Sequence, residues 1–349
     1  MGSLPSPDLP KPWVSTPLIE SAALSKAAGC RIFLKLENLQ PAASFKSRGI
    51  GNLIRRALLT HPTPHLTHFY SSSGGNAGLA CVTAAHTLGR PATVVVPMPT
   101  KPLMVAKIKN AGATDVIQTG ASWAEADAYL REELLAKDKN GVYVPPFDHE
   151  DVWDGAATII EELEEKPDAV VCSVGGGGLF CGLMMGLDKK DWGDVKVLTV
   201  ETAGAESLHK SLAKGERVRL DEITSICTSL GASMVGQKTF EYGQQRKNVR
   251  SVVLEDREAV MGCWRLADDE RFLVEPACGV NVALCYDGRL AKALPGLTAE
   301  SKVVIVLCGG AAVTLELLME WRDRFGLMEK ETTGDEEVPS TVARNGLVG

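Results

Sequence analysis

The chain has 349 residues, of which 45% are hydrophobic and 23% are charged, and its formal net charge at pH 7 is −7. This composition is typical of a soluble globular protein with enough apolar residues for one large core or two modest ones. The acidic balance excludes a surface that attracts nucleic acid or anionic lipid. No apolar run approaches the roughly 20 residues that a membrane-spanning helix requires, so neither nucleic acid nor membrane is an expected partner.

Short β-rich runs alternate with helical patterns along most of the chain. Several of these runs are continuously apolar, which is typical of strands buried on both faces of a parallel sheet. The alternation predicts an α/β fold with mostly parallel strands, and the number of strands favours two sheets over one. The predicted strands are 31–37, 67–73, 92–97, 114–119, 141–147, 169–174, 195–201, 251–256 and 302–310, and the predicted helices are 76–89, 122–137, 154–166 and 256–270. The polar, acidic segment 328–349 shows no periodicity and is predicted to be flexible.

The cysteines are scattered singly, and no Cys-x-x-Cys pair occurs. Their number, nine, is odd, which argues against a disulfide framework and against a structural zinc site. The cysteine pattern therefore predicts a reducing, cytoplasmic location. The residues are Cys30, Cys81, Cys172, Cys181, Cys227, Cys263, Cys278, Cys285 and Cys308.

Three glycine-rich turns follow predicted strands. They are SSSGGNAG (71–78), SVGGGGLFCG (173–182) and LCGGAA (307–312). Because ligands of parallel α/β sheets bind at the carboxyl ends of the strands, we expect the three turns to line one shared cleft.

The second of these turns contains four consecutive glycines, Gly175–Gly178, directly before a helical pattern. Free N–H groups at a helix start, with no Cβ atoms in the way, bind phosphate. The G-x-G-x-x-G and Walker A spacings are not met, so the dinucleotide-binding and P-loop motifs are excluded. The alternative is a tight strand–helix turn. Four consecutive glycines lose much conformational entropy on folding, which is a high cost for a turn with no other role.

Lys46 lies in the stretch PAASFKSRG (41–49). On this stretch alone, it could be a solvated lysine at the start of a helix with Ser44 as the N-cap. A lysine in a glycine-lined, phosphate-binding cleft could instead form a Schiff base with pyridoxal phosphate. The stretch SSSGGNAG leaves a similar choice. Its serines, backbone N–H groups and Asn76 suit a carboxylate or the phenolic oxygen of a pyridoxal ring, but they also suit a serine-rich turn with an Asn N-cap.

Taken together, PAASFKSRG, SSSGGNAG, SVGGGGLFCG and LCGGAA, in this order and separation, resemble the pyridoxal-phosphate serine/threonine dehydratases, and in particular the eukaryotic-type L-serine dehydratases. The likeness extends from about residue 16 to about residue 327. It implies the tryptophan-synthase-β-like fold (fold type II), with two open, twisted, mostly parallel sheets, flanking helices and the cofactor in the cleft between two domains. It also implies a small domain over 40–144, a large cofactor-binding domain over 1–39 and 145–327, and a homodimer.

The resemblance implies a role for each motif residue. Lys46 would carry the cofactor covalently, with Phe45 against its ring, Asn76 bonded to its 3-oxygen and Cys308 facing its pyridine nitrogen. The phosphate would lie on Gly175, Gly176, Gly177, Gly178 and Leu179, and the substrate on Ser73, Gly74, Asn76 and Ala77. A monovalent cation, K⁺ in the first instance, would be held by the Glu201 side chain and by the carbonyl groups of Gly175, Ala205, Leu230 and Ala232.

The expected reaction is β-elimination, which converts L-serine to pyruvate and ammonia and also L-threonine to 2-oxobutanoate. A buried lysine with a lowered pKa can remove the Cα proton. A thiol at Cys308 is too weak a donor to keep a pyridine nitrogen protonated, which favours elimination over racemisation or transamination. The implied role is amino-acid catabolism that supplies gluconeogenesis. Two alternatives stay open: β-replacement of the cysteine-synthase type, and a catalytically weak relative that only binds the cofactor or an amino acid.

Two positions depart from the relatives. Racemases of this group use a serine as a second acid/base at the position of Gly74, and many threonine dehydratases and racemases have a histidine where this chain has Ala77. Because glycine cannot transfer a proton, racemisation is not expected. A missing side chain beside the substrate is also expected to widen the pocket or loosen the orientation of the substrate.

Overall fold

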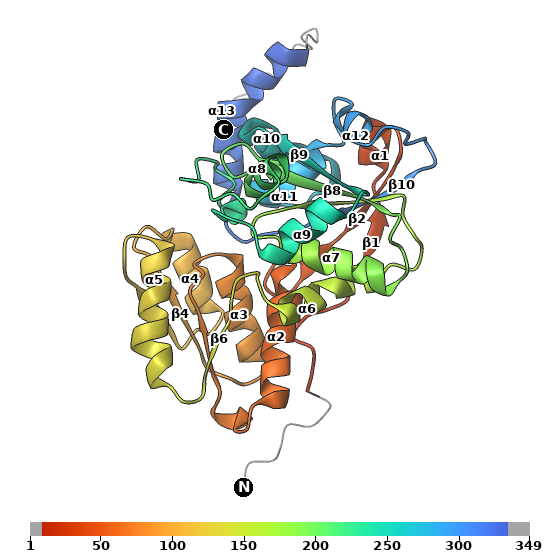
Figure 1. Cartoon of the computed structure of the whole chain (residues 1–349). Helices are drawn as coiled ribbons and strands as arrows, with labels where there is room; N and C mark the ends of the chain where they lie inside the picture. The colour runs from red at the N-terminus through yellow and green to blue at the C-terminus, as the bar shows by residue number, and fades with distance from the viewer. Residues whose placement is uncertain (1–8, 334–349) are drawn as a thin grey trace, which may run out of the picture.

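The computed structural model describes residues 9–333, which form two lobes, each built around one sheet (Figure 1). The larger lobe contains a six-stranded sheet in the order β1-β2-β10-β7-β8-β9. All neighbouring strands in it are parallel except the edge pair β1 and β2. The strands are β1 (Leu18–Glu20), β2 (Arg31–Lys35), β7 (Ala169–Ser173), β8 (Lys196–Thr202), β9 (Val249–Leu254) and β10 (Lys302–Val306).

The smaller lobe contains a four-stranded, fully parallel sheet in the order β5-β4-β3-β6. Its strands are β3 (His68–Ser71), β4 (Ala92–Val96), β5 (Asp115–Gln118) and β6 (Gly141–Tyr143). All five residues of β4 are buried, as expected for a central strand covered on both faces. The predicted α/β architecture with two mostly parallel sheets is therefore confirmed.

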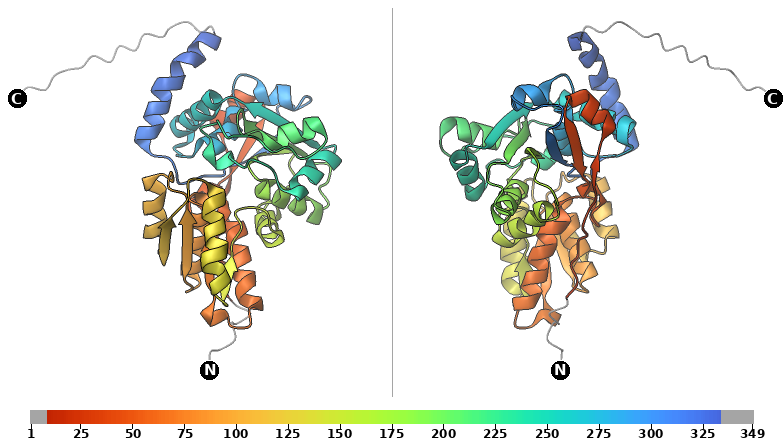
Figure 2. Two further views of the ribbon diagram at one scale, coloured as in Figure 1. Left: turned by 60° about the vertical axis from the view of Figure 1, so that its left-hand side comes forward. Right: turned by 90° about the vertical axis from the view of Figure 1, so that its right-hand side faces the viewer.

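Helices flank both sheets (Figure 2). In the larger lobe they are α1 (Ala22–Ala28), α6 (Glu150–Glu161), α7 (Gly178–Lys189), α8 (Ser207–Lys214), α9 (Gln237–Gln245), α10 (Asp256–Glu270), α11 (Pro276–Ala283), α12 (Arg289–Ala293) and α13 (Leu315–Thr333). The helices α2 (Lys46–Thr60), α3 (Asn76–Thr87), α4 (Pro102–Asn110) and α5 (Trp123–Tyr129) belong to the smaller lobe. In the described residues, no helix combines the length and the apolar character that a membrane span requires.

Some elements differ from the prediction. The predicted helix 122–137 is α-helical only to Tyr129, and a π-helical turn over 130–134 and a 3₁₀ turn over 135–137 follow. Strand β1 was not predicted, because three partly exposed residues give no apolar run. Residues 328–333, predicted to lack regular structure, continue helix α13, whereas 334–349 lie outside the described residues.

A buried ionic cluster fixes the first turn of α2 against the larger lobe. The Arg48 side chain is fully buried, and its guanidinium group donates to Glu37 at 2.7 Å and to Glu162 at 2.5 Å. Lys35 of β2 also donates to Glu162, at 2.6 Å. Buried charges are tolerated only when they are paired in this way, so the cluster determines where the residues before Arg48 lie.

Candidate active site

The segment before α2 lies against the segment after β10. The Phe45 N–H donates to the Cys308 carbonyl at 3.2 Å, and the Gly310 N–H donates to the Ala43 carbonyl at 2.8 Å. Ala43 has a positive φ of 54°, which is uncommon outside glycine and turns the chain toward α2. These contacts place Lys46, the first residue of α2, beside Cys308.

Lys46 does not behave as a solvated helix-start lysine. Its Nζ donates to the Pro146 carbonyl at 2.6 Å and lies 5.2 Å from the centre of the Phe45 ring. Burial lowers the pKa of the Lys46 amine to about 8, because the charged form loses water. Ser44 is not an N-cap: residue 45 holds that position, and no hydrogen bond to the buried Ser44 Oγ occurs in the described part of the chain.

Cys308 is buried and has polar neighbours. Its Sγ is 3.6 Å from Ser173 Oγ and 3.8 Å from Asn281 Nδ2. A hydrogen bond from the Cys278 thiol lowers the pKa of Cys308. The residue that bonds the Phe45 N–H through its backbone thus carries a thiol rather than a carboxylate.

The tetraglycine turn connects β7 to α7, and its neighbours leave no room for side chains. A Cβ atom on Gly176 would lie 2.3 Å from the Phe147 ring, and one on Gly178 would lie 2.6 Å from the Phe147 carbonyl oxygen. Gly177 has a φ of 96°, and a Cβ atom there would lie 2.0 Å from Thr239 Oγ1. The glycines are therefore required by close packing and by backbone conformation together.

This turn also presents unused donors. Among the described residues, no hydrogen bond is donated by the backbone N–H groups of Gly175, Gly176, Gly177, Gly178 or Leu179. These N–H groups precede or begin α7, where the helix dipole favours negative charge. A phosphate group fits such a cradle.

Asn76 is the first residue of α3, but its side chain does not cap the helix, because Gly75 holds the N-cap position. The Asn76 Nδ2 donates to both oxygens of Glu275, at 3.1 and 3.2 Å. The Asn76 Oδ1 accepts from the Ala311 N–H at 2.9 Å. In the same loop, Gly78 is required, since a Cβ atom there would lie 1.8 Å from the Ser73 carbonyl oxygen. Ala77 is buried behind the loop.

The space beside Gly74 is filled. A Cβ atom on Gly74 would lie 2.7 Å from Thr100 Cγ2, 3.0 Å from Thr100 Oγ1 and 3.2 Å from Val96 Cγ1. The expected widening of the pocket at Gly74 is therefore wrong on this side, because Thr100 occupies the volume that a side chain would take.

Glu201 lies fully buried at the end of β8. Its carboxylate accepts from the Leu208 N–H at 2.8 Å and the His209 N–H at 2.7 Å, both at the start of α8. Burial raises the pKa of Glu201 to about 8 despite these two hydrogen bonds, and the nearby Glu206 adds to the rise.

Two oxygen atoms that lack partners within residues 9–333 lie in the residues just before the N–H groups that bind Glu201. In the described chain, Glu206 Oε2 and Ser207 Oγ are buried and have no hydrogen-bond partner. Gly175 packs against residues 229 and 230, since its Cβ position lies 3.1 Å from the Ser229 carbonyl oxygen and 3.3 Å from that of Leu230. A cation would satisfy such oxygen atoms. Over residues 9–333, no group of three or more His, Cys, Asp or Glu side chains is arranged to bind a metal.

The structure joins most of the predicted residues through a few shared neighbours. Segment 145–147 contacts Lys46 through the Pro146 carbonyl and contacts the tetraglycine turn through Phe147. Segment 308–312 contacts both Phe45 and Asn76. The expectation of one site shared by the three glycine-rich turns agrees with these contacts.

Sequence reasoning assigned no role to Glu275, Ser229, Phe147 or Thr239. Glu275 precedes a proline at the start of α11, where an acidic residue is an ordinary helix-terminal feature. Ser229 donates to the Glu275 carboxylate at 2.5 Å. Thr239 donates to the Gly176 carbonyl at 3.3 Å. No local pattern indicates these contacts, because their partners lie far apart in the chain.

Comparison with known proteins gives consistent findings. Residues 11–309 match the family described as "Pyridoxal-phosphate dependent enzyme". The chain is 42% identical over 324 residues to an L-serine dehydratase of Saccharomyces cerevisiae (strain AWRI1631), which covers 87% of this chain and 95% of the relative. It is 41% identical over 331 residues to the L-serine dehydratase/L-threonine deaminase of Homo sapiens, and the match covers 91% of this chain and 97% of the human protein.

Among solved structures, the chain is similar to a fungal L-serine ammonia-lyase from Rhizomucor miehei. The TM-score is 0.83 and the sequence identity 35%, and the match covers 90% of this chain and 99% of the other.

Proposed function

Because the chain belongs to the family of pyridoxal-phosphate-dependent enzymes, we propose that it is an L-serine ammonia-lyase that also acts on L-threonine. Pyridoxal phosphate is its cofactor. The observation that carries the proposal is the packing of the lysine segment against Cys308: the Phe45 N–H donates to the Cys308 carbonyl, and the next residue, Lys46, supplies an amine with a pKa of about 8.

The residues present fit the cofactor. Lys46 supplies the amine for covalent attachment, and the unused N–H groups of Gly175–Gly178 and Leu179 suit the phosphate. We propose that Phe45 lies against the ring, that Asn76 bonds the 3-oxygen and that Cys308 faces the pyridine nitrogen. When bound, the cofactor supplies an electron sink that stabilises negative charge at the substrate's Cα.

The chain's own residues position the substrate and move its proton. We propose that the 73–77 loop holds the carboxylate through Ser73, the Asn76 amide and the N–H at Ala77, with Gly74 against the substrate. This hold aligns the Cα–H bond. Lys46 Nζ then takes the Cα proton, for which an amine with a pKa of about 8 is suited. The sulfur at Cys308 favours elimination, and Gly74 offers no second acid for racemisation.

A monovalent cation, K⁺, is proposed beside the phosphate turn. The ligands would be Glu201 and the carbonyl groups of Gly175, Ala205, Leu230 and Ala232. The unpartnered oxygens Glu206 Oε2 and Ser207 Oγ support it, because among the described residues they are acceptors without donors at the start of α8, although the other Glu206 oxygen pairs with Lys210 at 2.7 Å. One of these ligands, the Gly175 carbonyl, belongs to the glycine turn proposed to hold the phosphate, so a bound cation would contact that turn directly.

The remaining features are proposals of the same kind. We propose domain boundaries near residues 40 and 144, supported by the fact that the four strands of the smaller sheet lie between His68 and Tyr143. We further propose a cytoplasmic homodimer that deaminates serine in amino-acid catabolism, with its pyruvate available for gluconeogenesis. The nine unpaired, buried cysteines agree with a reducing compartment.

The function is tested by the release of pyruvate from L-serine. The wild-type protein should form pyruvate and show the absorbance of covalently bound cofactor, and Lys46→Ala should lose both. Lys26→Ala, on an exposed helix position, is the matched control. Turnover of serine by Lys46→Ala, or a product formed only when sulfide is supplied, would contradict the assignment and favour β-replacement in the latter case.

A further inference from the structure

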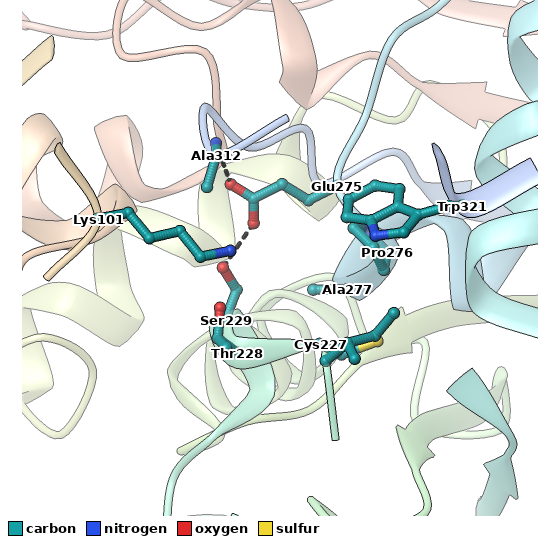
Figure 3. A pocket seen from close by; sticks show the side chains of 10 residues that line it. Lys101, Cys227, Thr228, Ser229, Glu275, Pro276, Ala277, Ala312 and Trp321 are labelled. Carbon is teal, nitrogen blue, oxygen red and sulfur yellow. Dashed lines mark hydrogen bonds between the residues drawn. The ribbon is translucent and has the colours of Figure 1, made fainter. Parts of the chain in front are cut away.

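Glu275 is a buried carboxylate on which three separate segments converge. It is 3% exposed and sits at the N-cap position of α11. Its oxygens accept from Asn76 Nδ2, from Ser229 Oγ at 2.5 Å and from the Ala312 N–H at 2.7 Å. Figure 3 shows the carboxylate between Ser229 and Ala312, with the Lys101 side chain pointing toward them. In the described residues, no ion pair to Glu275 is formed, so neutral donors hold it.

The backbone is shaped to admit this carboxylate. Gly310 has a φ of 117°, and a Cβ atom there would lie 2.3 Å from the Glu275 Cδ. The Glu275 N–H also donates to the Gly309 carbonyl, at 3.4 Å. Glu275 is therefore packed against the same glycine pair that contacts the Lys46 segment.

The contacts determine which end of the Asn76 amide carries the nitrogen. A carboxylate only accepts hydrogen bonds, so it must face Nδ2, and the Ala311 N–H only donates, so it must face Oδ1. An amide held from both ends in this way cannot turn over without losing both interactions. The Asn76 Nδ2 also donates to Ser229 Oγ, at 3.4 Å, which is longer than its contacts with Glu275. The N–H that does not face Glu275 is therefore weakly engaged, and a ligand with a better acceptor would take it from Ser229.

We propose that Glu275 is a positioning residue that orients the Asn76 amide, so that its remaining N–H is directed at the 3-oxygen of the cofactor. This inference rests on the role proposed above for Asn76. Glu275 acts through Asn76, because the hydrogen bonds from Asn76, Ser229 and Ala312 already occupy its carboxylate.

The test compares the affinity of the apoprotein for pyridoxal phosphate, measured by absorbance titration, in four proteins: wild type, Glu275→Gln, Asn76→Ala and the double variant. The introduced glutamine would present an NH₂ group to one of three donors, so the hold on Asn76 is lost at nearly constant volume. We expect Glu275→Gln to weaken cofactor binding about tenfold, the effect of roughly one well-formed hydrogen bond. It should also shift the pH midpoint at which the absorbance of the bound cofactor titrates.

The decisive comparison is the double variant. If Glu275 acts through Asn76, Glu275→Gln should change the affinity of Asn76→Ala by less than about twofold. The proposal would be overturned if the losses of cofactor affinity caused by Glu275→Gln and Asn76→Ala multiplied in the double variant. It would also be overturned if Glu275→Gln left both the cofactor affinity and the titration midpoint unchanged. Glu258→Gln is the matched control, since Glu258 bonds Glu255 and Arg289 instead and should leave the cofactor's affinity and absorbance unchanged.

The readout does not depend on turnover. A wild-type protein that binds the cofactor but forms no pyruvate would refute the proposed function, and the affinities would still decide the role of Glu275. If Glu275→Gln fails to fold, Glu275→Asp takes its place in the same four-protein comparison. Aspartate keeps the charge but withdraws the carboxylate by one methylene group, so it should again weaken binding in the wild type and not in Asn76→Ala.

Discussion

Gly74 and Thr100 share one small volume at the edge of the 73–77 loop. The Gly74 φ is not positive, so its backbone can accept alanine, and the obstacle is the Thr100 side chain. A threonine side chain is short and stiff at χ1, and it cannot swing away as a lysine could. The effect of a side chain at residue 74 is therefore decided by residue 100.

We expect Gly74→Ala to lower kcat/KM for L-serine about tenfold, because overpacking of about 1–3 kcal/mol displaces the substrate loop. Gly74→Ala/Thr100→Ala should recover most of the loss, since both contacting atoms of Thr100 are removed. Thr100→Ala alone serves as the control. A rise in kcat/KM in Gly74→Ala with Thr100 intact would mean that the glycine had left usable space after all.

Lys46 should govern the pH dependence of covalent cofactor uptake. Attachment requires the neutral amine, and burial lowers the pKa of Lys46 to about 8. The rate at which the absorbance of the attached cofactor appears in the apoprotein should rise about tenfold per pH unit below this value and level off above it. A midpoint near the ordinary lysine pKa of about 10.4 would contradict the assigned burial. The contribution of the Lys46 amine to the free energy of unfolding is present above the pKa of lysine in the unfolded chain. This contribution is lost as pH falls through about 8, the pKa of Lys46 in the folded protein.

At the scale of elements, the start of α8 and the end of β8 form one unit through Glu201. Two N–H groups of the helix compensate only part of the cost of burying the carboxylate, and the pKa of Glu201 is therefore raised to about 8. Its contribution to stability is present below the unfolded pKa and is lost as pH rises through about 8. A bound cation would favour the ionised form and oppose this loss.

Thermal unfolding of the apoprotein can detect that cation. K⁺ should raise the Tm relative to tetramethylammonium at equal ionic strength, and the increase should grow between about pH 6 and about pH 8. Glu201→Gln should remove the difference between the two ions. Equal Tm values in the two salts for the wild type would argue against a cation at this carboxylate.

At the scale of the whole molecule, the sequence predicts the individual strands and motif residues better than it predicts which strands and side chains come into contact. All nine predicted strands occur, and fully buried strands such as β4 and β7 were readable because continuous apolar runs indicate burial on both faces of a sheet. Their order could not be read, since β10, the last strand in the chain, lies between β2 and β7. The role of Glu275 was hidden for the same reason, because its partner Asn76 is 199 residues away.

The motif residues were found because their chemistry is local: four glycines, a lysine and an Asn loop stand out wherever they fold. Thr100, Phe147 and Thr239 carry no such signal. Their importance appears only in the fold, where they exclude side chains from Gly74, Gly176 and Gly177.

The pairing of segment 43–45 with 308–310 bears on how the protein is made. The lysine segment is synthesised before the strand β10 that leads to Cys308, and most of the described elements are made between the two. Contacts of such long sequence separation form late, because the intervening chain must first be ordered. We therefore expect a nascent chain that has not yet reached Cys308 to carry a more ordinarily basic Lys46, which acquires its lowered basicity only after segment 308–310 has been made.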